Sequence, residues 1–181
     1  MSNRLAPRVE PWPETIATAL AAYPAQDGYL LSLFRTFANS ERFLKKAVPN
    51  LLDKGSPVPL RIREIVILRT TANRNCEYEW GVHVTIFAAA AKLSPEQITA
   101  TRALQIDAAL WSPPEVGLLS AIDQLCADGR LDNATQAQFE ADWSLEQQLE
   151  ILALVGTYHT ISFVANVARL PAEPFGARFP G

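Results

Sequence analysis

The sequence predicts an all-α protein, and two observations carry this prediction. Apolar residues recur at helical spacing through most of the 181-residue chain. Helix-start patterns such as Ser94-Pro95 punctuate these segments, whereas no segment shows the alternation of a strand or the turn of a hairpin. We therefore expect a single helical domain over residues 1–181, with its core motif at residues 60–98.

The amino-acid composition and net charge argue against several classes of function. Hydrophobic residues make up 49% of the chain and charged residues 19%, as in globular proteins. The net charge is −3 without any Lys/Arg cluster, so we expect no nucleic-acid or anionic membrane partner. The N-terminus lacks an apolar signal region, and we see no apolar run of the length of a membrane span. We expect a cytoplasmic protein with Cys76 and Cys126 reduced.

In the N-terminal half, the first residues are rich in proline, so residues 1–13 are expected to form an extended arm. We expect helices at residues 13–23, 26–38, 40–53 and 60–73. Pro49 should kink or split the third of these. The fourth has a β-branched run that would also suit a buried strand, but its length favours an amphipathic helix.

In the C-terminal half, Asn75 can cap a helix over residues 76–92. Ser94, Ser112 and Ser144 each begin a capping-box pattern, and Asp128-Gly129 can end the helix that starts at Ser112. We expect a short helix at 134–141, a last helix to about residue 168 with Gly156 inside it, and an extended tail at 170–181.

A faint internal repeat is also present. Glu64 lies twelve residues before Cys76, and Glu150 lies twelve residues before Ser162. This equal spacing suggests a degenerate helical repeat.

The stretch "NCEYEWGVH" holds the residues that could carry chemistry. On a helix Cys76, Glu79, Trp80 and His83 share one face. Cys76 at the first helical position would be favoured as a thiolate, and His83 has an ordinary pKa near neutrality. Glu64 could join them if the two helices pack antiparallel. The alternative is an ordinary packed core with a buried cysteine and a paired histidine.

Other kinds of site have weaker support. Glu79 and His83 could chelate a metal, but the chain has only two histidines and no zinc-ligand spacing, so we expect no metal. The sequence contains neither a phosphate-binding glycine loop nor a G-x-S-x-G turn.

The segment from Arg61 to Ile98, "RIREIVILRTTANRNCEYEWGVHVTIFAAAAKLSPEQI", resembles the core of the carboxymuconolactone decarboxylase family. This family also contains the alkylhydroperoxidase D proteins. The resemblance implies an alkylhydroperoxidase D-like helical bundle that works without a cofactor and assembles as a dimer, trimer or hexamer.

In the alkylhydroperoxidase branch a relay glutamate precedes a Cys-x-x-Cys pair and a histidine. The resemblance places that glutamate at Glu64, the first cysteine at Cys76 and the histidine at His83. Glu79 stands where the second cysteine would be. A carboxylate cannot resolve a sulfenic acid as a disulfide, so the chain is a single-cysteine variant.

The decarboxylase branch keeps the acidic residues and the histidine. Its members act on small carboxylated lactones and must stabilise an enolate and protonate a carbon. By this resemblance we expect decarboxylation or proton transfer on a small carboxylated or lactone-type organic acid. His83 would be the main acid/base and Glu79 its partner or a second proton carrier. Glu64 would complete the relay, and Cys76 would line the pocket.

Two alternatives stay open. One is a thiol-dependent peroxidase that uses Cys76 with an external thiol. The other is a non-catalytic, ligand-binding oligomer, in which Glu79 and His83 would pair only with each other in a closed pocket.

Overall fold

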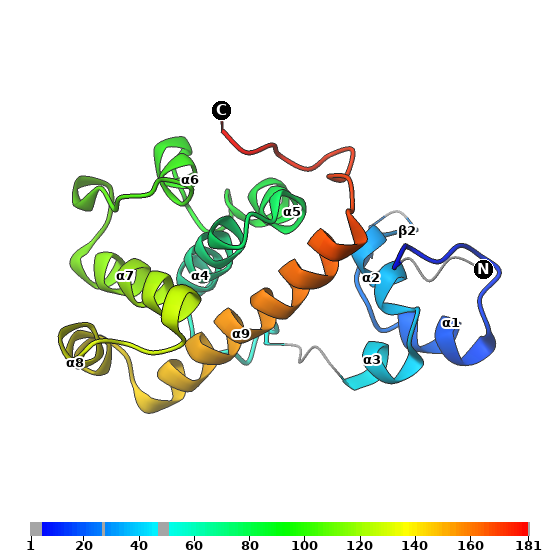
Figure 1. Ribbon diagram of the computed structural model, residues 1–181, viewed down its shortest axis with the longest axis horizontal. Coiled ribbons are helices and arrows are strands. Elements are labelled where there is room, and N and C mark those ends of the chain that lie inside the picture. Colours follow the sequence, from blue (N-terminus) through cyan, green and yellow to red (C-terminus); the bar gives the residue numbers. More distant parts are fainter. Residues whose placement is uncertain (1–4, 27, 47–50, 181) are drawn as a thin grey trace.

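The computed structural model describes residues 5–26, 28–46 and 51–180, and the regular secondary structure of this part is almost entirely helical (Figure 1). The helices are α1 (Glu14–Leu20), α2 (Ser32–Phe37), α3 (Glu41–Lys46), α4 (Leu60–Asn73), α5 (Glu77–Phe87), α6 (Pro95–Ala100), α7 (Pro113–Asp128), α8 (Asn133–Asp142) and α9 (Leu145–Ala168). A 3₁₀ turn, η1, covers Ala108–Leu110. The prediction of an all-α fold is confirmed.

Helix α4 is the centre of the domain. It packs against α5, α7 and α9, and every residue from Glu64 to Ala72 is buried. The prediction of an amphipathic helix was therefore wrong, because neighbouring helices cover α4 on several sides. The buried Arg69 is tolerated since it donates two hydrogen bonds to Asp123, each 2.6 Å long.

Helix α9 is the longest helix that the structure describes, and it lies beside α4 (Figure 1). Its inner face packs on α4, and Ile151, Leu154 and Ile161 are among its buried residues. By length and composition alone α9 could cross a membrane, which the sequence analysis did not anticipate. Since one face of α9 is part of the domain core, this is weak evidence for a membrane span.

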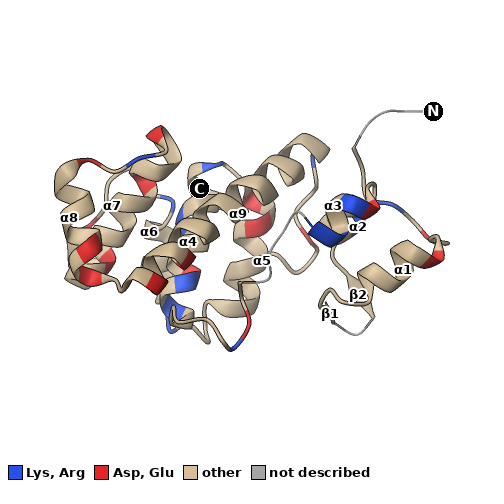
Figure 2. Ribbon diagram, turned by 90° about the horizontal axis from the view of Figure 1, so that it is seen from below, with Lys and Arg blue, Asp and Glu red and all other residues tan. Residues whose placement is uncertain are grey.

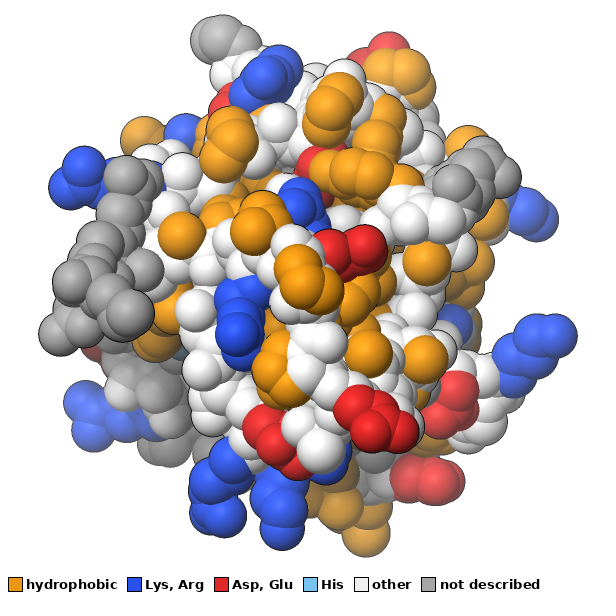
Figure 3. All heavy atoms as spheres, turned by 90° about the vertical axis from the view of Figure 1, so that its right-hand side faces the viewer, with side chains coloured by type: hydrophobic (Ala, Val, Ile, Leu, Met, Phe, Trp, Pro, Cys, Tyr) orange, Lys and Arg blue, Asp and Glu red, His pale blue; other side chains and the backbone are white. Residues whose placement is uncertain are grey.

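The N-terminal helices α1 to α3 lie at one end of the molecule (Figures 1 and 2). The helix predicted at residues 26–38 begins only at Ser32, because a β-hairpin with two residues in each strand precedes it. Its strands are β1 (Ala25–Gln26) and β2 (Tyr29–Leu30), and Gly28 in the turn has a φ of 78°. Figure 3 shows this end of the molecule, where hydrophobic side chains form small groups between basic and acidic ones.

Two other predicted boundaries differ from the structure. Helix α3 ends at Lys46, and the kink predicted at Pro49 lies outside the described residues. Helix α5 ends at Phe87, not near residue 92, and Lys92 adopts a left-handed φ of 55°. The run of small residues after Phe87 forms turns and not a continued helix.

The three helix starts predicted from capping boxes are confirmed. Capping boxes begin α6 at Ser94, α7 at Ser112 and α9 at Ser144. Gly129, with a φ of 68°, ends α7 in the left-handed conformation that favours glycine. The starts of these three helices therefore depend on residues within one helical turn, not on tertiary contacts.

The C-terminal tail is extended and runs back across α5 (Figure 1). The amide of Ala177 donates to the carbonyl of Gly81 over 3.1 Å. A Cβ atom at position 81 would stand 2.2 Å from the Ala177 carbonyl oxygen, so only glycine permits this approach. Phe179 packs its ring on Trp80, and the Phe179 amide donates to Glu77. The tail is thus a packed layer over α5.

Candidate functional site: a buried Glu–His–Tyr cluster

Helices α4, α5 and α9 bring three polar side chains together in the core. The Nδ1 atom of His83 lies 2.8 Å from Oε2 of Glu64, and its Nε2 atom lies 2.9 Å from the Tyr158 hydroxyl. All three side chains are buried. Both ring nitrogens of His83 therefore have a partner, which fixes the orientation of the imidazole.

The cluster favours a protonated histidine. Burial by itself opposes the imidazolium, but the charge and hydrogen bond of Glu64, with a further contribution from Glu79, raise the pKa of His83 above its ordinary value. Burial, reinforced by the nearby carboxylates, raises the pKa of Tyr158, so its hydroxyl stays neutral and can donate a hydrogen bond.

Glu79 lies next to His83 but is bonded less closely. Its Oε2 atom is 3.7 Å from Nε2 of His83, and its Oε1 atom is buried without a hydrogen-bond partner among the described residues. Burial raises the pKa of Glu79 to about 7, although the charge of His83 opposes this shift. At neutral pH Glu79 can therefore both give and take a proton. No other described residue occupies its Oε1 atom with a hydrogen bond.

Cys76 is the N-cap of α5, so the helix begins one residue later than predicted, and the prediction of Asn75 as its cap was wrong. Burial raises the pKa of its thiol to about 11, and the negative charge of Glu79 also opposes the thiolate. The prediction of a thiolate favoured by the helix start was wrong, because burial and Glu79 outweigh the helix dipole. The buried hydroxyl of Ser162 lies beside Cys76, and this contact lowers the pKa of the thiol by less than burial raises it.

The residues of "NCEYEWGVH" separate into two groups. Glu79 and His83 lie on the same face of α5, as their helical spacing suggested, and His83 contacts Glu64 of α4. Cys76 lies next to Glu79. Trp80 does not join them. Its Nε1 donates to the Thr101 hydroxyl over 3.0 Å, and its ring packs against the tail.

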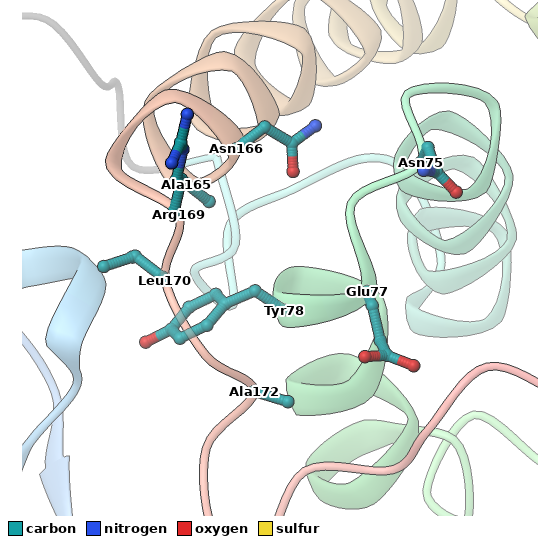
Figure 4. Close-up of a pocket in the computed structure, with 8 residues that line it drawn as sticks. All are labelled: Asn75, Glu77, Tyr78, Ala165, Asn166, Arg169, Leu170 and Ala172. Carbon is teal, nitrogen blue, oxygen red and sulfur yellow. The ribbon is translucent and has the colours of Figure 1, made fainter.

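All four predicted site residues are buried, so they do not line an open pocket. A hollow of about 390 Å³ lies between the start of α5 and the end of α9 (Figure 4). Its lining residues are Asn75, Glu77, Tyr78, Ala165, Asn166, Arg169, Leu170 and Ala172. In sequence, Cys76 lies between the lining residues Asn75 and Glu77, and Ser162 lies one helical turn before Ala165. Glu64, Glu79, His83 and Tyr158 are not among the lining residues.

Tyr78 separates this hollow from the N-terminal helices. Its hydroxyl donates to Glu173 in the tail and accepts from the amide of Leu33 over 3.1 Å. Glu173 also accepts from the hydroxyl of Tyr29 and from the amide of Ser32. Burial opposes ionisation of Glu173, but these hydrogen bonds lower its pKa, so it is a carboxylate at neutral pH.

Sequence reasoning missed Tyr158, Ser162 and Glu173 as neighbours of the site. Tyr158 and Ser162 lie on α9, far along the chain from "NCEYEWGVH". The equal spacing of Glu64–Cys76 and Glu150–Ser162 did single out Ser162, but Glu150 instead contacts Ser56 away from the cluster. No local pattern identified Glu173.

The other histidine lies in a different place. The Nε2 atom of His159 is 3.1 Å from the Cys126 sulfur, between α9 and α7. Burial and the positive charge of Arg74 lower the pKa of His159. Within the described residues, no group of three or more histidine, cysteine, aspartate or glutamate side chains is placed to hold a metal ion.

The fold and the motif define the class of protein. The structure is similar to that of an uncharacterized peroxidase-related protein from Silicibacter sp. TM1040, with a TM-score of 0.77 and 13% sequence identity. The match covers 99% of this chain and 100% of that one, so the chain has the all-helical alkylhydroperoxidase D-like fold.

The family follows from the sequence comparison. Residues 42–124 match the model of the carboxymuconolactone decarboxylase family, the same family that the segment from Arg61 to Ile98 resembles. A search of curated proteins found no match to the chain. The family contains decarboxylases and peroxidases, so the particular reaction has to be argued from the site.

Proposed function

We propose that the chain is a cofactor-independent enzyme that transfers a proton to or from a small carboxylated or lactone-type organic acid, with decarboxylation as the leading reaction. The observation that carries this proposal is Glu79. Its pKa lies at about 7, its Oε1 atom is buried without a partner, and His83 stands 3.7 Å from its other oxygen. A carboxyl group near neutrality in a water-poor site is suited to general acid–base catalysis.

In the proposed decarboxylation, the bond between the substrate carbon and its carboxylate breaks and carbon dioxide leaves. The electron pair moves into the conjugated carbonyl and forms an enolate. Hydrogen-bond donors in a desolvated site stabilise such an anion, and the protonated Glu79 then supplies the proton that forms the new C–H bond. His83 returns a proton to Glu79, and Glu64 keeps His83 charged for this transfer.

Tyr158 would hold the other end of the relay. Its hydroxyl contacts Nε2, the nitrogen of His83 that also lies nearer to Glu79. A neutral phenol at this position can accept from Nε2 of the charged His83 and donate to an anionic intermediate, because its pKa is raised. We propose that the substrate enters from the hollow beside Cys76, where the start of α5 and the end of α9 meet (Figure 4).

The thiol-peroxidase alternative has less support from the site. Peroxide reduction requires a thiolate, whereas burial raises the pKa of Cys76 to about 11. Glu79 cannot resolve a sulfenic acid. The non-catalytic alternative predicted that Glu79 and His83 would pair only with each other. Instead His83 contacts Glu64 and Tyr158, and one Glu79 oxygen is unpaired.

Turnover assays would test the proposal. The full-length protein should be assayed against a panel of carboxylated lactones and, separately, against organic peroxides with and without added thiol. Decarboxylation without any added cofactor is the expected result. Glu79→Gln and His83→Ala should each lower kcat by a factor of about 10² to 10⁴.

The matched variant is Cys76→Ser, which should slow decarboxylation only modestly. If peroxide consumption is the activity found and Cys76→Ser abolishes it, the chain is a one-cysteine peroxidase and the acid–base proposal is wrong. Unchanged turnover in His83→Ala would equally contradict the roles given above.

A further inference from the structure

We propose that two hollows sharing Asn75 form one binding site for a small dianion, such as a dicarboxylate or a phosphate ester, held by Arg102 and Arg169. By the Asn75 site we mean these two hollows together. The inference goes beyond the proposed chemistry, because no residue of the Glu–His–Tyr cluster lines either hollow and binding of an anion requires no turnover.

The two hollows meet at the turn between α4 and α5. The first, of about 390 Å³, is the hollow between the start of α5 and the end of α9 (Figure 4). The second, of about 410 Å³, lies between the end of α4, the segment after α6, and α7, and Arg102 is among its lining residues. Asn75 lines both hollows. Each volume is sufficient for a small organic molecule.

The lining of the Asn75 site carries two positive charges that no carboxylate neutralises. Arg169 lines the first hollow and Arg102 the second, and neither forms an ion pair with the described residues. The hydrogen bonds of Arg102 go to neutral acceptors, the carbonyl of Ala72 over 3.2 Å and Oδ1 of Asn75 over 3.0 Å. Both charges are therefore available to an anion.

The two carboxylates of the lining do not cancel these charges. Glu77 in the first hollow accepts from Nη1 of Arg178 over 3.3 Å and from the amide of Phe179 over 2.9 Å. Asp123 in the second hollow accepts from two nitrogens of Arg69, each over 2.6 Å. Since each carboxylate already has its own cation, the Asn75 site stays positive on a chain whose net charge is −3.

Arg102 is held in place before any ligand binds. Its guanidinium carbon stands 3.8 Å from the centre of the Phe179 ring, while its nitrogens donate to Ala72 and Asn75. A guanidinium has five N–H donors, so further donors remain for an oxyanion. Because its orientation is already fixed, this side chain loses little freedom when it binds a ligand.

The backbone around the first hollow points to a role for the Arg169 side chain. Asn75 and Arg169 lie on opposite sides of this hollow (Figure 4), and both have a left-handed φ, of 50° and 52°. Asparagine adopts this conformation readily, whereas arginine does so at a cost, and glycine is the usual residue after a helix end. Arg169 is the C-cap of α9. Residues strained in this way cluster at ligand-binding sites.

The charges of the lining define the class of ligand. Guanidinium groups bind carboxylates and phosphates through paired, charge-assisted hydrogen bonds. Two unneutralised guanidiniums, Arg102 and Arg169, favour a ligand with two negative charges over a ligand with one. The fold thus brings together positive charges from separate segments, although the sequence shows no cluster of basic residues.

Binding of simple anions to the full-length protein tests the site. Succinate and inorganic phosphate are the probes for the two kinds of dianion, and propionate is the probe with a single charge. In calorimetric titrations at low salt, one dianion per chain should bind at least about tenfold more tightly than propionate. Added salt should weaken this binding. Absence of binding by both dianions, or equally tight binding of propionate, would overturn the proposal.

Arginine variants locate the binding. Arg102→Gln and Arg169→Gln should each weaken binding of the dianion by about tenfold, since each removes a charge-assisted contact. Arg42→Gln is the matched control, because Arg42 is an exposed arginine of α3 that lines neither hollow. It should leave the affinity within about twofold of the wild-type value. Equal weakening in all three variants would show unspecific attraction to positive charge and contradict the proposed site.

Arg169→Gly separates binding from folding. Glycine suits the left-handed backbone at this position, so the thermal unfolding midpoint should stay the same or rise, while the dianion binds as weakly as to Arg169→Gln. Unchanged affinity in Arg169→Gly would sink the assignment of Arg169. Because these titrations involve no turnover, their failure would leave the acid–base proposal standing, and failed turnover assays would leave the Asn75 site standing.

Discussion

The two histidines of the chain occupy opposite environments. His83 is enclosed by α4, α5 and α9, where burial is outweighed by Glu64 and Glu79 and the pKa is raised. His159 is half-buried at the surface of α9 beside Cys126, where burial and Arg74 lower the pKa. The same side chain is thus set up to carry a proton in one place and to stay neutral in the other. What decides the difference is the charge of the neighbours, since burial opposes the charged form in both.

The largest expected difference between the two histidines is in stability. His83→Leu removes the partner of Glu64, which is then left buried without a cation, and we expect a loss of about 3–5 kcal/mol in the free energy of unfolding. His159→Leu should change it by less than about 1 kcal/mol, because its neighbours are a thiol and solvent. Urea denaturation of both variants measures this. Equal losses would show that the buried cluster has no special energetic role.

The dependence of stability on pH should separate the same two regions. The pKa of His83 is raised, so its contribution to stability is complete below about pH 6.5 and is lost as the pH rises through the higher folded pKa. The pKa of Glu79 is raised to about 7, so its contribution is likewise lost as the pH rises from about 4.5 to 7. His159 acts in the other direction and costs stability as the pH falls below about 6.5.

We therefore expect the urea concentration at the unfolding midpoint to decrease as the pH is raised from 6.5 to 8.5. The slope should be at most about 1.4 kcal/mol per pH unit for each proton involved. In His83→Leu the fall over this interval should be much smaller, and in His159→Leu it should be unchanged. A wild-type midpoint that rises over the same interval would contradict the assignment.

A direct measurement of the two imidazoles gives a smaller but sharper signal. In a proton NMR titration, the ring resonances of His83 should shift with a midpoint above pH 6.5 and those of His159 with a midpoint below it. Glu64→Gln should lower the midpoint of His83 and leave that of His159 in place. If the two midpoints coincide, the neighbouring carboxylates do not govern His83.

The two thiols should differ least. Burial raises the pKa of both, but Cys76 is 0% exposed whereas Cys126 is 7% exposed. We expect iodoacetamide at pH 7.5 to modify Cys126 slowly and Cys76 only after unfolding, as mass spectrometry of digested protein would show. Faster modification of Cys76 would point to an accessible thiolate and would favour the peroxidase alternative.

Local signals explain which parts of the fold could be predicted. The starts at Ser94, Ser112 and Ser144 depend on contacts within one helical turn, so sequence alone identified them. The hairpin after Ala25 was missed because strands of two residues are too short to show alternation. The burial of α4 was missed because two of the three helices that cover it, α7 and α9, lie far along the chain.

The same reasoning applies to the candidate site. Glu79 and His83 are one helical turn apart, and the family motif brought Glu64 into the prediction beside them. Tyr158 reaches His83 only because α9 packs across α4, and no spacing in the sequence encodes that contact. The chemistry of Cys76 was misjudged because its pKa depends on burial, which a helix-start pattern does not report.

Glu173 offers a simple way to observe the tail. This one carboxylate accepts from the hydroxyls of Tyr29 and Tyr78 and from the backbone amide of Ser32 over 2.8 Å. The amide of Ser32 is therefore shielded from solvent by a residue 141 positions away. Its hydrogen–deuterium exchange rate would report how often the tail lifts from α5. A single amide at the start of α2 thus serves as a built-in sensor of the opposite end of the chain.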